Sequence, residues 1–263
     1  MAASTSEPDI GDLLRLWRQR RRFSQQELSN RSAVSTRHLS RVETGKAHPT
    51  PEMIMRLADH LDLPLRDRNR LLLSGGFAPR FDEHALDDTG LAVIMSGLRD
   101  LLTAHLPYPA LLLDDRWDIV DSNTAVDQLV DGCADWLLEP PVNVLKLCLH
   151  PDGLAPRIRN QQEWGAHLMR RLRSRAERTH DPRHRALLDE LSGYLDGPDS
   201  LAPAGPVLTL EIDVRGRPAT FFSTSAQLDT AVDTTLEGLH LETFLPADEA
   251  TRDLMRGASR RGE

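Results

Sequence analysis

Six side chains between positions 35 and 41 could form hydrogen bonds with the edges of nucleic-acid bases. They are Ser35, Thr36, Arg37, His38, Ser40 and Arg41. Hydroxyl, imidazole and guanidinium groups are the donors and acceptors that proteins use for this chemistry, and one arginine can donate two parallel hydrogen bonds to a guanine. Arg37 is the residue that we expect to make such a bidentate contact.

A second group of polar side chains is suited to contacts with phosphate. Gln25 and Gln26 begin the preceding segment, where the amides of a helix N-terminus and nearby side chains can bind phosphate oxygens. Arg15, Arg22 and Lys46 would add ionic contacts that weaken as the salt concentration rises. Together with the first group, these residues predict an interface with double-stranded DNA.

The distribution of charge supports this prediction, although the chain as a whole is acidic. The 263 residues carry a formal net charge of −8, which by itself argues against a nucleic-acid partner. Residues 1–82, however, hold 14 Lys and Arg against 10 Asp and Glu, and residues 10–46 hold 9 against 3. The acidic excess therefore lies in the rest of the chain. We expect a basic N-terminal unit joined to an acidic partner domain.

Hydrophobic spacing and capping residues predict the helices that position these side chains. Leu13, Leu14 and Trp17 share one face of a first helix. Ser24, with Glu27 three residues later, has the pattern of a capping box at the start of a second helix. Three more helices are expected after Ser35, from Thr50 to Leu61 and from Pro64 to Ser74, with Gly45 ending the first of them. The second and third helices, joined by a short turn at Ala33 and Val34, have the pattern of a helix-turn-helix.

Over about residues 10–75 the sequence resembles the XRE/Cro-like repressor family. The residues that carry the resemblance are Arg18, Phe23 to Leu28, Val34, Ser35 and Leu39 to Gly45. The resemblance implies an all-α, five-helix domain of the lambda-repressor-like kind over residues 8–80, with its third helix in the major groove of DNA. It also implies an internal ion pair between Arg18 and Glu43, which we treat as structural.

The sequence departs from this family at two positions. Ser29 stands where the family often has alanine, and Ala33 stands where it often has glycine. Glycine adopts a positive φ without steric cost, whereas alanine does so only with strain. Ala33 therefore predicts either a small backbone strain or a shifted turn.

The rest of the chain predicts a charged linker over residues 81–91 and an α+β domain over residues 92–255. Strands are expected at 110–113, 117–121, 207–214, 219–224 and 239–245, and helices at 88–105, 123–129, 160–178, 181–195 and 247–256. Strand pairs interleaved with helices favour one α+β fold, so the protein as a whole is expected to be multidomain. Residues 256–263 are expected to form a flexible tail.

This second domain resembles the MmyB-like regulator ligand-binding domain, which has a PAS-like fold. The residues that carry the resemblance are Pro109 to Leu112, Trp117 to Val120, Asn123, Val142 to Leu145, His150 to Leu154, Trp164 and Phe244 to Asp248. The resemblance implies an apolar pocket between sheet and helices that takes a fatty-acyl-like ligand. The candidate lining residues are Trp117, Asn123, Trp164, Leu168, Phe221 and Phe222, each with an ordinary core role as the alternative.

The sequence does not favour an enzyme, a cofactor or a metal site. It has no Walker A loop, no GxGxxG motif and no GxSxG elbow. His180 and His184 have the spacing of a metal-binding pair, but Pro182 lies between them and no third ligand follows at a typical spacing. His150 and Asp152 lie in a stretch typical of a turn. We therefore expect a protein without catalytic residues or cofactors.

Composition predicts a cytoplasmic location. No apolar run reaches the roughly 18 residues of a membrane span, and the N-terminus lacks the pattern of a signal peptide. Cys133 and Cys148 have no CxxC spacing and are expected to be reduced thiols.

These observations predict a transcriptional regulator that binds promoter DNA as a homodimer and is controlled by a small apolar ligand in its second domain. Two alternatives remain for that domain: an acidic surface that docks a protein partner, and an enzyme. In a symmetric dimer the two half-sites would lie about one helical turn, ~34 Å, apart. The sequence leaves open the operator, the ligand, the dimer interface and whether transcription is activated or repressed.

Overall fold

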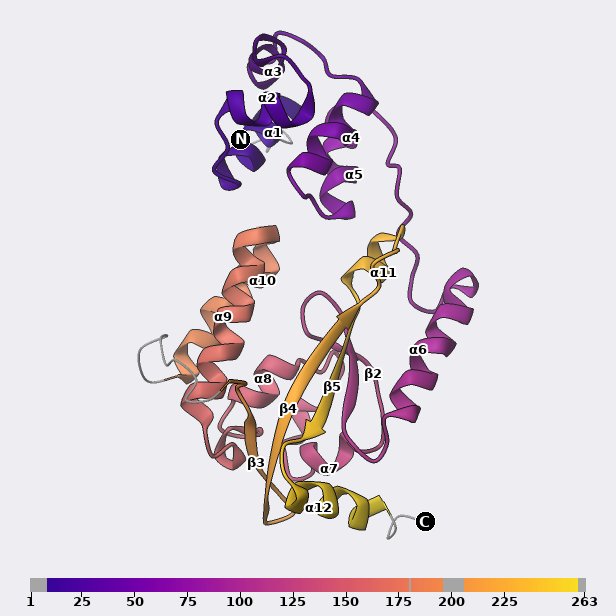
Figure 1. Cartoon of the computed structure of the whole chain (residues 1–263), viewed down its shortest axis with the longest axis vertical. Coiled ribbons are helices and arrows are strands. Elements are labelled where there is room, and N and C mark those ends of the chain that lie inside the picture. Colours follow the sequence, from indigo (N-terminus) through magenta and orange to yellow (C-terminus); the bar gives the residue numbers. More distant parts are fainter. Residues whose placement is uncertain (1–8, 180, 196–205, 260–263) are drawn as a thin grey trace, which may run out of the picture. The chain divides into compact units, whose positions relative to one another are not determined.

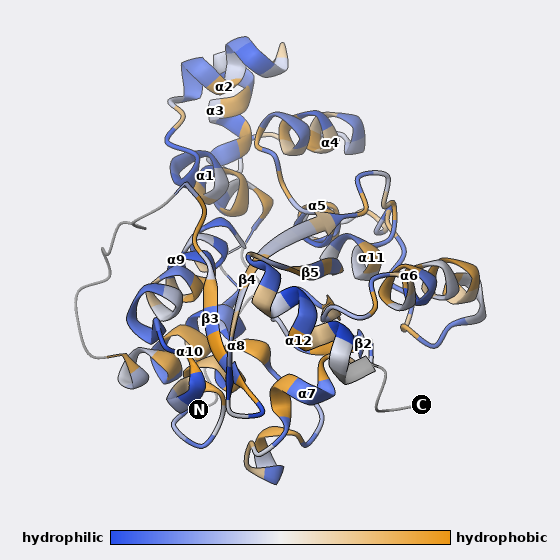
Figure 2. Cartoon of the chain, turned by 60° about the horizontal axis from the view of Figure 1, so that its bottom comes forward, coloured by the Kyte–Doolittle hydropathy of each residue, from blue (hydrophilic) through white to orange (hydrophobic). Residues whose placement is uncertain are grey.

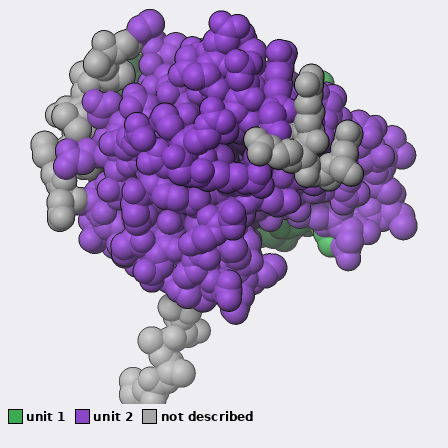
Figure 3. Space-filling view, turned by 90° about the horizontal axis from the view of Figure 1, so that it is seen from below, with its two compact units in different colours: residues 1–85, 230–237 green, residues 86–229, 238–263 purple. Residues whose placement is uncertain are grey.

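The computed structural model describes residues 9–179, 181–195 and 206–259, and the chain divides into two compact units (Figures 1 and 3). Unit 1 contains the residues up to Ala85 together with Thr230–Glu237, and unit 2 contains Leu86–Asp229 and the residues from Gly238 onward. His180 of the predicted histidine pair, residue 8 and the end of the predicted tail lie outside the described residues.

Unit 1 contains the five predicted helices. They are α1 Ile10–Arg20, α2 Gln25–Ser32, α3 Thr36–Glu43, α4 Pro51–His60 and α5 Leu65–Ser74. Their apolar faces meet in one core, in which Leu14, Leu28, Leu39, Ile54 and Leu57 are fully buried. The helical N-terminal part of the predicted fold class is therefore confirmed.

The predicted helix starts are formed by hydrogen bonds between side chains and the backbone. The Glu27 amide donates to Ser24 Oγ at 3.1 Å and the Ser24 amide donates to Glu27 Oε2 at 2.7 Å, which is a complete capping box. The Ser35 hydroxyl accepts from the His38 amide at 3.2 Å at the start of α3. These caps determine where α2 and α3 begin, and so which side chains occupy the exposed first turn of α3.

Ala33, between α2 and α3, has a left-handed backbone conformation. Its φ is 54° and its ψ is 29°, in the region that favours glycine. The expectation of strain at this alanine is therefore confirmed, and the turn keeps its place between the two helices.

Replacing Ala33 with glycine is expected to stabilise unit 1 by about 0.5–1 kcal/mol. Removing the Cβ relieves the left-handed strain of about 1–2 kcal/mol, and the greater freedom of glycine in the unfolded chain offsets about 0.4–1 kcal/mol of that gain. Chemical denaturation of the full chain measures the change. A control variant, Ala58→Gly, removes a buried Cβ inside α4 and should destabilise the same unit.

The segment between the fourth and fifth strands of unit 2 folds with unit 1. It carries most of the short helix α11, Thr234–Gly238. Its Glu237 carboxylate accepts a hydrogen bond from the Leu65 amide at 2.9 Å, at the start of α5. Its Asp233 carboxylate lies 2.8 Å from Nδ1 of His84 and also accepts from the His84 amide at 3.1 Å. Sequence reasoning had not separated this segment from the second domain.

Unit 2 is built on a five-stranded antiparallel sheet in the order β2-β1-β5-β4-β3 (Figure 1). The strands are β1 Ala110–Leu113, β2 Ile119–Ser122, β3 Leu210–Val214, β4 Arg217–Gln227 and β5 His240–Pro246. β4 runs three residues beyond its predicted end because Ser225, Ala226 and Gln227 still pair with β5. β2 begins two residues later than predicted, because Trp117 belongs to the turn that precedes it.

Six α-helices in the described part of unit 2 precede, separate or follow its strands along the chain. They are α6 Ala92–Ala104, α7 Asp127–Val130, α8 Val144–Leu149, α9 Gln161–Thr179, α10 Pro182–Leu191 and α12 Glu249–Ser259. α8 was not predicted, although Asn143 marks its start by accepting from the amides of Leu145 and Lys146. The predicted helix over residues 181–195 ends earlier, at Leu191, and continues as a 3-10 turn.

The core of unit 2 lies between the sheet and the group formed by α8, α9 and α10. β1 is buried along its whole length, as expected for a central strand packed on both faces, and α6 packs against it. β3 and α8 are largely apolar in Figure 2 and contribute to this core. None of the described helices combines the length and hydrophobicity required to span a bilayer.

Candidate functional site

The helix-turn-helix presents an exposed polar surface on α3. Arg37, His38 and Arg41 are exposed, whereas Leu39 and Val42 on the opposite side are buried in the core of unit 1. The amphipathic spacing of this eight-residue helix thus separates the side chains that hold it in place from those that can bind a partner. The exposed side chains of this surface are among those predicted to contact bases.

The other predicted DNA-binding residues lie on α1, α2 and α3 and in the loops beside them. Gln26, Ser35, Arg22 and Lys46 are exposed, and Gln25, Thr36, Ser40 and Arg15 are half-buried. Hydrogen bonds connect several of them. Thr36 Oγ1 donates to Gln26 Oε1 at 3.1 Å, and Arg41 donates to the Lys46 carbonyl at 3.2 Å. These contacts tie α3 to the start of α2 and to the loop after α3.

Two of the predicted phosphate ligands are bound to Glu43 in this structure. The Gln25 amide donates to Glu43 Oε2 at 2.8 Å, and Arg15 donates to the Glu43 carbonyl at 2.8 Å. Their role as DNA ligands stays a prediction, and both also help to hold α3 against α1 and α2.

Arg18 and Glu43 form the internal ion pair that the family resemblance implied. Arg18 Nε lies 2.7 Å from Glu43 Oε1, and its Nη2 lies 2.8 Å from Oε2, so the pair is bidentate. The Glu43 side chain is fully buried. Burial raises the pKa of this carboxyl, but the hydrogen bonds from Arg18 and Gln25 outweigh burial and leave the pKa below its ordinary value. The pair joins α1 to α3 and is a structural element.

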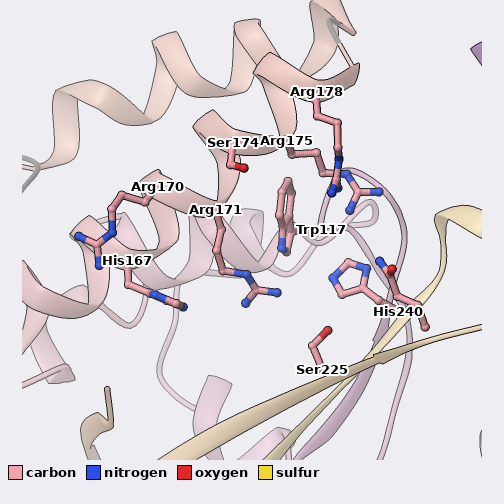
Figure 4. A pocket seen from close by; sticks show the side chains of 10 residues that line it. Trp117, His167, Arg170, Arg171, Ser174, Arg175, Arg178, Ser225 and His240 are labelled. Carbon is pink, nitrogen blue, oxygen red and sulfur yellow. The ribbon is translucent and has the colours of Figure 1, made fainter. Parts of the chain in front are cut away.

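Unit 2 contains a pocket of about 360 Å³ between α9 and the ends of β4 and β5 (Figure 4). Its lining residues are Trp117, His167, Arg170, Arg171, Ser174, Arg175, Arg178, Ser225, Gln227 and His240. Its volume falls in the range of small-molecule sites, about 300–1,000 Å³. Trp117 is the one large apolar side chain among these ten, so this pocket differs from the apolar pocket that the family resemblance implied.

Of the residues predicted to bind a ligand, Trp117 lines this pocket and the others lie elsewhere. Trp164, Leu168 and Phe221 are buried in the core of unit 2. Phe222 is half-buried on the opposite face of β4 from Phe221. Asn123 has a structural position, since its amide donates to two backbone carbonyls, at 2.9 Å and 2.8 Å, and ties the end of α6 to the start of β1.

Two histidines at the pocket are neutral at physiological pH. Burial, together with the charges of Arg175 and Arg171, lowers the pKa of His240 to about 4 against the opposing effect of Glu242. Burial and the charges of Arg171 and Arg170 lower the pKa of His167 to about 4. The positive charge of the pocket therefore comes from its arginines.

His184, the described member of the predicted histidine pair, is held by structural contacts. It is fully buried, with Nδ1 at 2.9 Å from Thr179 Oγ1 and Nε2 at 2.8 Å from the Asp115 carbonyl. Within the described ranges, no group of three or more His, Cys, Asp or Glu side chains is arranged to hold a metal ion.

A pattern in the sequence indicates the pocket arginines. Trp164, Leu168, Arg171, Arg175 and Arg178 repeat at three and four residues, which places them on one face of a helix. This face is apolar at its N-terminal end and cationic at its C-terminal end. A change of this kind along one stripe indicates that the helix leaves the core and borders a polar site.

Comparison with protein families matches both units. A helix-turn-helix family model covers residues 9–71, and the model of the MmyB-like transcription regulator ligand binding domain covers residues 94–257, which is more than half of the chain.

The chain belongs to the MmyB-like family of transcription regulators. With a helix-turn-helix at its N-terminus, this MmyB-like regulator is a DNA-binding protein of multidomain, all-α plus α+β layout. No curated protein matches it. A solved RNA-binding light-oxygen-voltage receptor is 14% identical, with a TM-score of 0.27 over 99% of this chain and 65% of the receptor chain. The MmyB-like regulator thus spans about two thirds of that chain's length.

Proposed function

We propose that this MmyB-like regulator is a sequence-specific transcription factor in which α3 recognises bases and unit 2 responds to a small molecule. The exposed polar side of α3 is the observation that carries the first part. Arg37, His38 and Arg41 can reach base edges in the major groove, while Arg22 and Lys46 supply contacts with phosphate. The protein acts by binding, and we assign no catalytic step to it.

The pocket at α9 supports control by a ligand rather than docking of a protein on the acidic domain. A ligand shifts an equilibrium between DNA-binding states only if it binds one state more tightly. The pocket lies where β4 ends at Gln227 and β5 begins at His240, and the segment between those residues carries the part of the chain that folds with unit 1. A ligand that moves these strand ends would change the backbone that leads into the DNA-binding unit.

A homodimer is the proposed DNA-binding form. Val93 and Leu101 on α6 are 84% and 55% exposed, and exposed apolar side chains on one helix suit a contact between copies. The PAS-like fold proposed for unit 2 is consistent with the strand order β2-β1-β5-β4-β3. Two-fold symmetry would place the two α3 helices at half-sites about one helical turn, ~34 Å, apart.

Two single substitutions separate base recognition from phosphate binding. Arg37→Ala is expected to reduce the preference among bases at one position by about 1–3 kcal/mol, whereas Arg22→Ala should weaken binding evenly across sequences and reduce the salt slope by about one unit. Both are measured by fluorescence anisotropy on duplexes selected from a random pool by the unaltered protein. The assignment of α3 fails if Arg37→Ala leaves the preference unchanged and Arg22→Ala alters it.

A further inference from the structure

The pocket of unit 2 has a cationic wall on α9. Arg171, Arg175 and Arg178 follow one another at spacings of four and three residues and reach toward the strand ends (Figure 4). Arg171 is paired with Glu242 of β5, at 2.9 Å from Nη1 to Oε1, and Glu242 is buried. This pair matches one acid with one arginine, and three further arginines line the pocket: Arg170, Arg175 and Arg178.

Arg175 lies over the ring of Trp117, with its guanidinium carbon 5.3 Å from the ring centroid. Burial and the charges of Arg178 and Arg171 lower the pKa of this guanidinium, against the opposing effect of Asp115 and Asp114. An arginine remains charged in proteins even when it is buried. Arg175 therefore places a partly desolvated positive charge beside an aromatic ring. Because the dielectric constant is lower there than in water, this charge attracts an anion more strongly.

Buried polar atoms without hydrogen-bond partners are concentrated at this pocket. In the described part of the chain, eight buried side-chain atoms lack a partner, and four of them are Trp117 Nε1, Arg175 Nε and the two ring nitrogens of His240. A buried polar atom left unpaired costs about 1–3 kcal/mol, so four in one place indicate a function for them. Trp117 and Arg175 can only donate, and the neutral His240 ring can donate through one nitrogen.

Trp117 is held in a strained conformation that aims it into the pocket. Its φ is 64°, a value that is a true outlier for a bulky side chain. The Asp114 carboxylate maintains the turn by accepting from the amides of Arg116 at 2.8 Å and Asp118 at 2.9 Å. Backbone strain of this kind persists where the surrounding structure enforces it, and it is frequent at binding sites.

We propose that this pocket binds a small organic carboxylate, with the carboxylate held by Arg175, Trp117 and His240 and with Arg178 at the open side. This proposal rests on the proposed control of the regulator by a ligand and names the chemical class of that ligand. The three groups are neighbours, since the Trp117 ring centroid lies 5.3 Å from the Arg175 guanidinium carbon and 6.1 Å from the His240 ring centroid. Each carries a buried nitrogen without a partner, and arginine binds carboxylates in two parallel hydrogen bonds.

The polar lining and the volume favour a compact acid over a long acyl chain. Nine of the ten lining residues are polar or charged, so the body of the ligand finds apolar surface mainly on Trp117. The apolar side chains that could have surrounded a chain, Trp164, Leu168 and Phe221, are packed in the core. The anionic group is thus expected to contribute most of the affinity.

Isothermal titration of the full-length protein with matched acids and amides tests this proposal. Benzoate and hexanoate are expected to bind about tenfold or more tightly than benzamide and hexanamide, because the amides lack the charge. In the series from butanoate to octanoate the affinity should stay nearly constant, whereas an acyl-chain site would gain about fourfold for each CH₂ group. Binding of inorganic phosphate but of no carboxylate would overturn the assignment of the ligand class.

Variants locate the binding site. Arg178→Gln changes an exposed side chain and should keep the fold while weakening carboxylate binding by about tenfold. Trp117→Phe keeps an aromatic ring but removes its Nε1 donor, and it should weaken carboxylate binding by about fivefold. The matched control is Arg185→Gln, which removes an exposed arginine from the neighbouring α10 and should have no effect. Equal losses from Arg178→Gln and Arg185→Gln would contradict the site.

DNA binding measured in the same samples separates this inference from the proposed function. If amides bind as tightly as acids and both change the affinity for DNA, control by a ligand holds and the carboxylate class is wrong. If acids bind through Arg178 but leave DNA affinity unchanged, the site is correct and the proposed control fails. The carboxylate site is also refuted if no acid shows saturable binding up to about 10 mM.

Discussion

Replacing Glu43 with glutamine is expected to destabilise unit 1 by about 3–5 kcal/mol, the cost of breaking a buried ion pair by removing one partner. Glutamine is nearly the same size, so the loss comes from the charge. Arg18 would stay buried beside a neutral amide, and Arg18 makes two charge-assisted hydrogen bonds to this carboxylate, at 2.7 and 2.8 Å. Because a small domain has only about 5–15 kcal/mol of stability, unit 1 should be largely unfolded at elevated temperature.

Urea denaturation of the full chain measures this loss, and hydrogen exchange of the α1 and α3 amides assigns it to unit 1. The matched control is Glu52→Gln, which neutralises an exposed carboxylate in the first turn of α4 and should cost less than about 1 kcal/mol. A Glu43→Gln variant as stable as this control would show that the ion pair makes no net contribution.

The same pair gives unit 1 a defined dependence on pH. The folded-state pKa of Glu43 lies below its ordinary value of 4.5. A depressed pKa means that the carboxylate contributes stability above pH 4.5, and that this contribution is lost as the pH falls through the lower, folded-state value. Unit 1 should therefore lose stability in acid below about pH 4.5, and the Glu43→Gln variant should lose less over the same interval.

Removing the three exposed side chains of α3 together is expected to abolish most sequence-specific DNA binding. In the variant Arg37→Ala, His38→Ala, Arg41→Ala, each lost base contact costs about 1–3 kcal/mol, so the affinity for the selected site should fall about 10²–10⁴-fold. The loss should be much smaller on random DNA, because phosphate contacts by other residues remain. Anisotropy titrations on both duplexes at one salt concentration measure the ratio.

A control triple variant removes the same charges from a different part of unit 1. Arg56, His60 and Arg70 are exposed on α4 and α5, so replacing them with alanine also removes two guanidinium groups and one imidazole. It should weaken specific and random binding to the same modest degree. If the α3 triple variant kept the specificity ratio of this control, α3 would not be the recognition helix.

The five N-terminal helices of unit 1 could be predicted from the sequence almost completely, since their signals are local. Capping at Ser24 and Ser35 depends on residues three positions away, and the strain at Ala33 follows from one backbone conformation. Even the Arg18–Glu43 pair, 25 residues apart, followed from a family resemblance.

The pocket in unit 2 was harder to predict because it combines distant residues. Trp117, Arg175 and His240 meet only after the sheet has brought β5 beside β1 and after α9 has packed across them. Aromatic residues were expected to line an apolar pocket, but hydrophobicity alone does not distinguish Phe221, which fills the core, from Trp117, which borders the pocket. The long turn after β4 gave no local sign that it folds with the N-terminal helices.

The hydrogen bonds between residues 230–237 and the N-terminal part of unit 1 limit how freely the DNA-binding unit can be exchanged between proteins. A gene fusion that joined residues up to Ala85 to another sensor would leave the Leu65 amide without Glu237 and His84 without Asp233. A working chimera would therefore need three breakpoints, one after Ala85 and one on each side of residues 230–237. Recombination between such regulators should accordingly preserve a DNA-binding unit together with the turn between β4 and β5 that completes it.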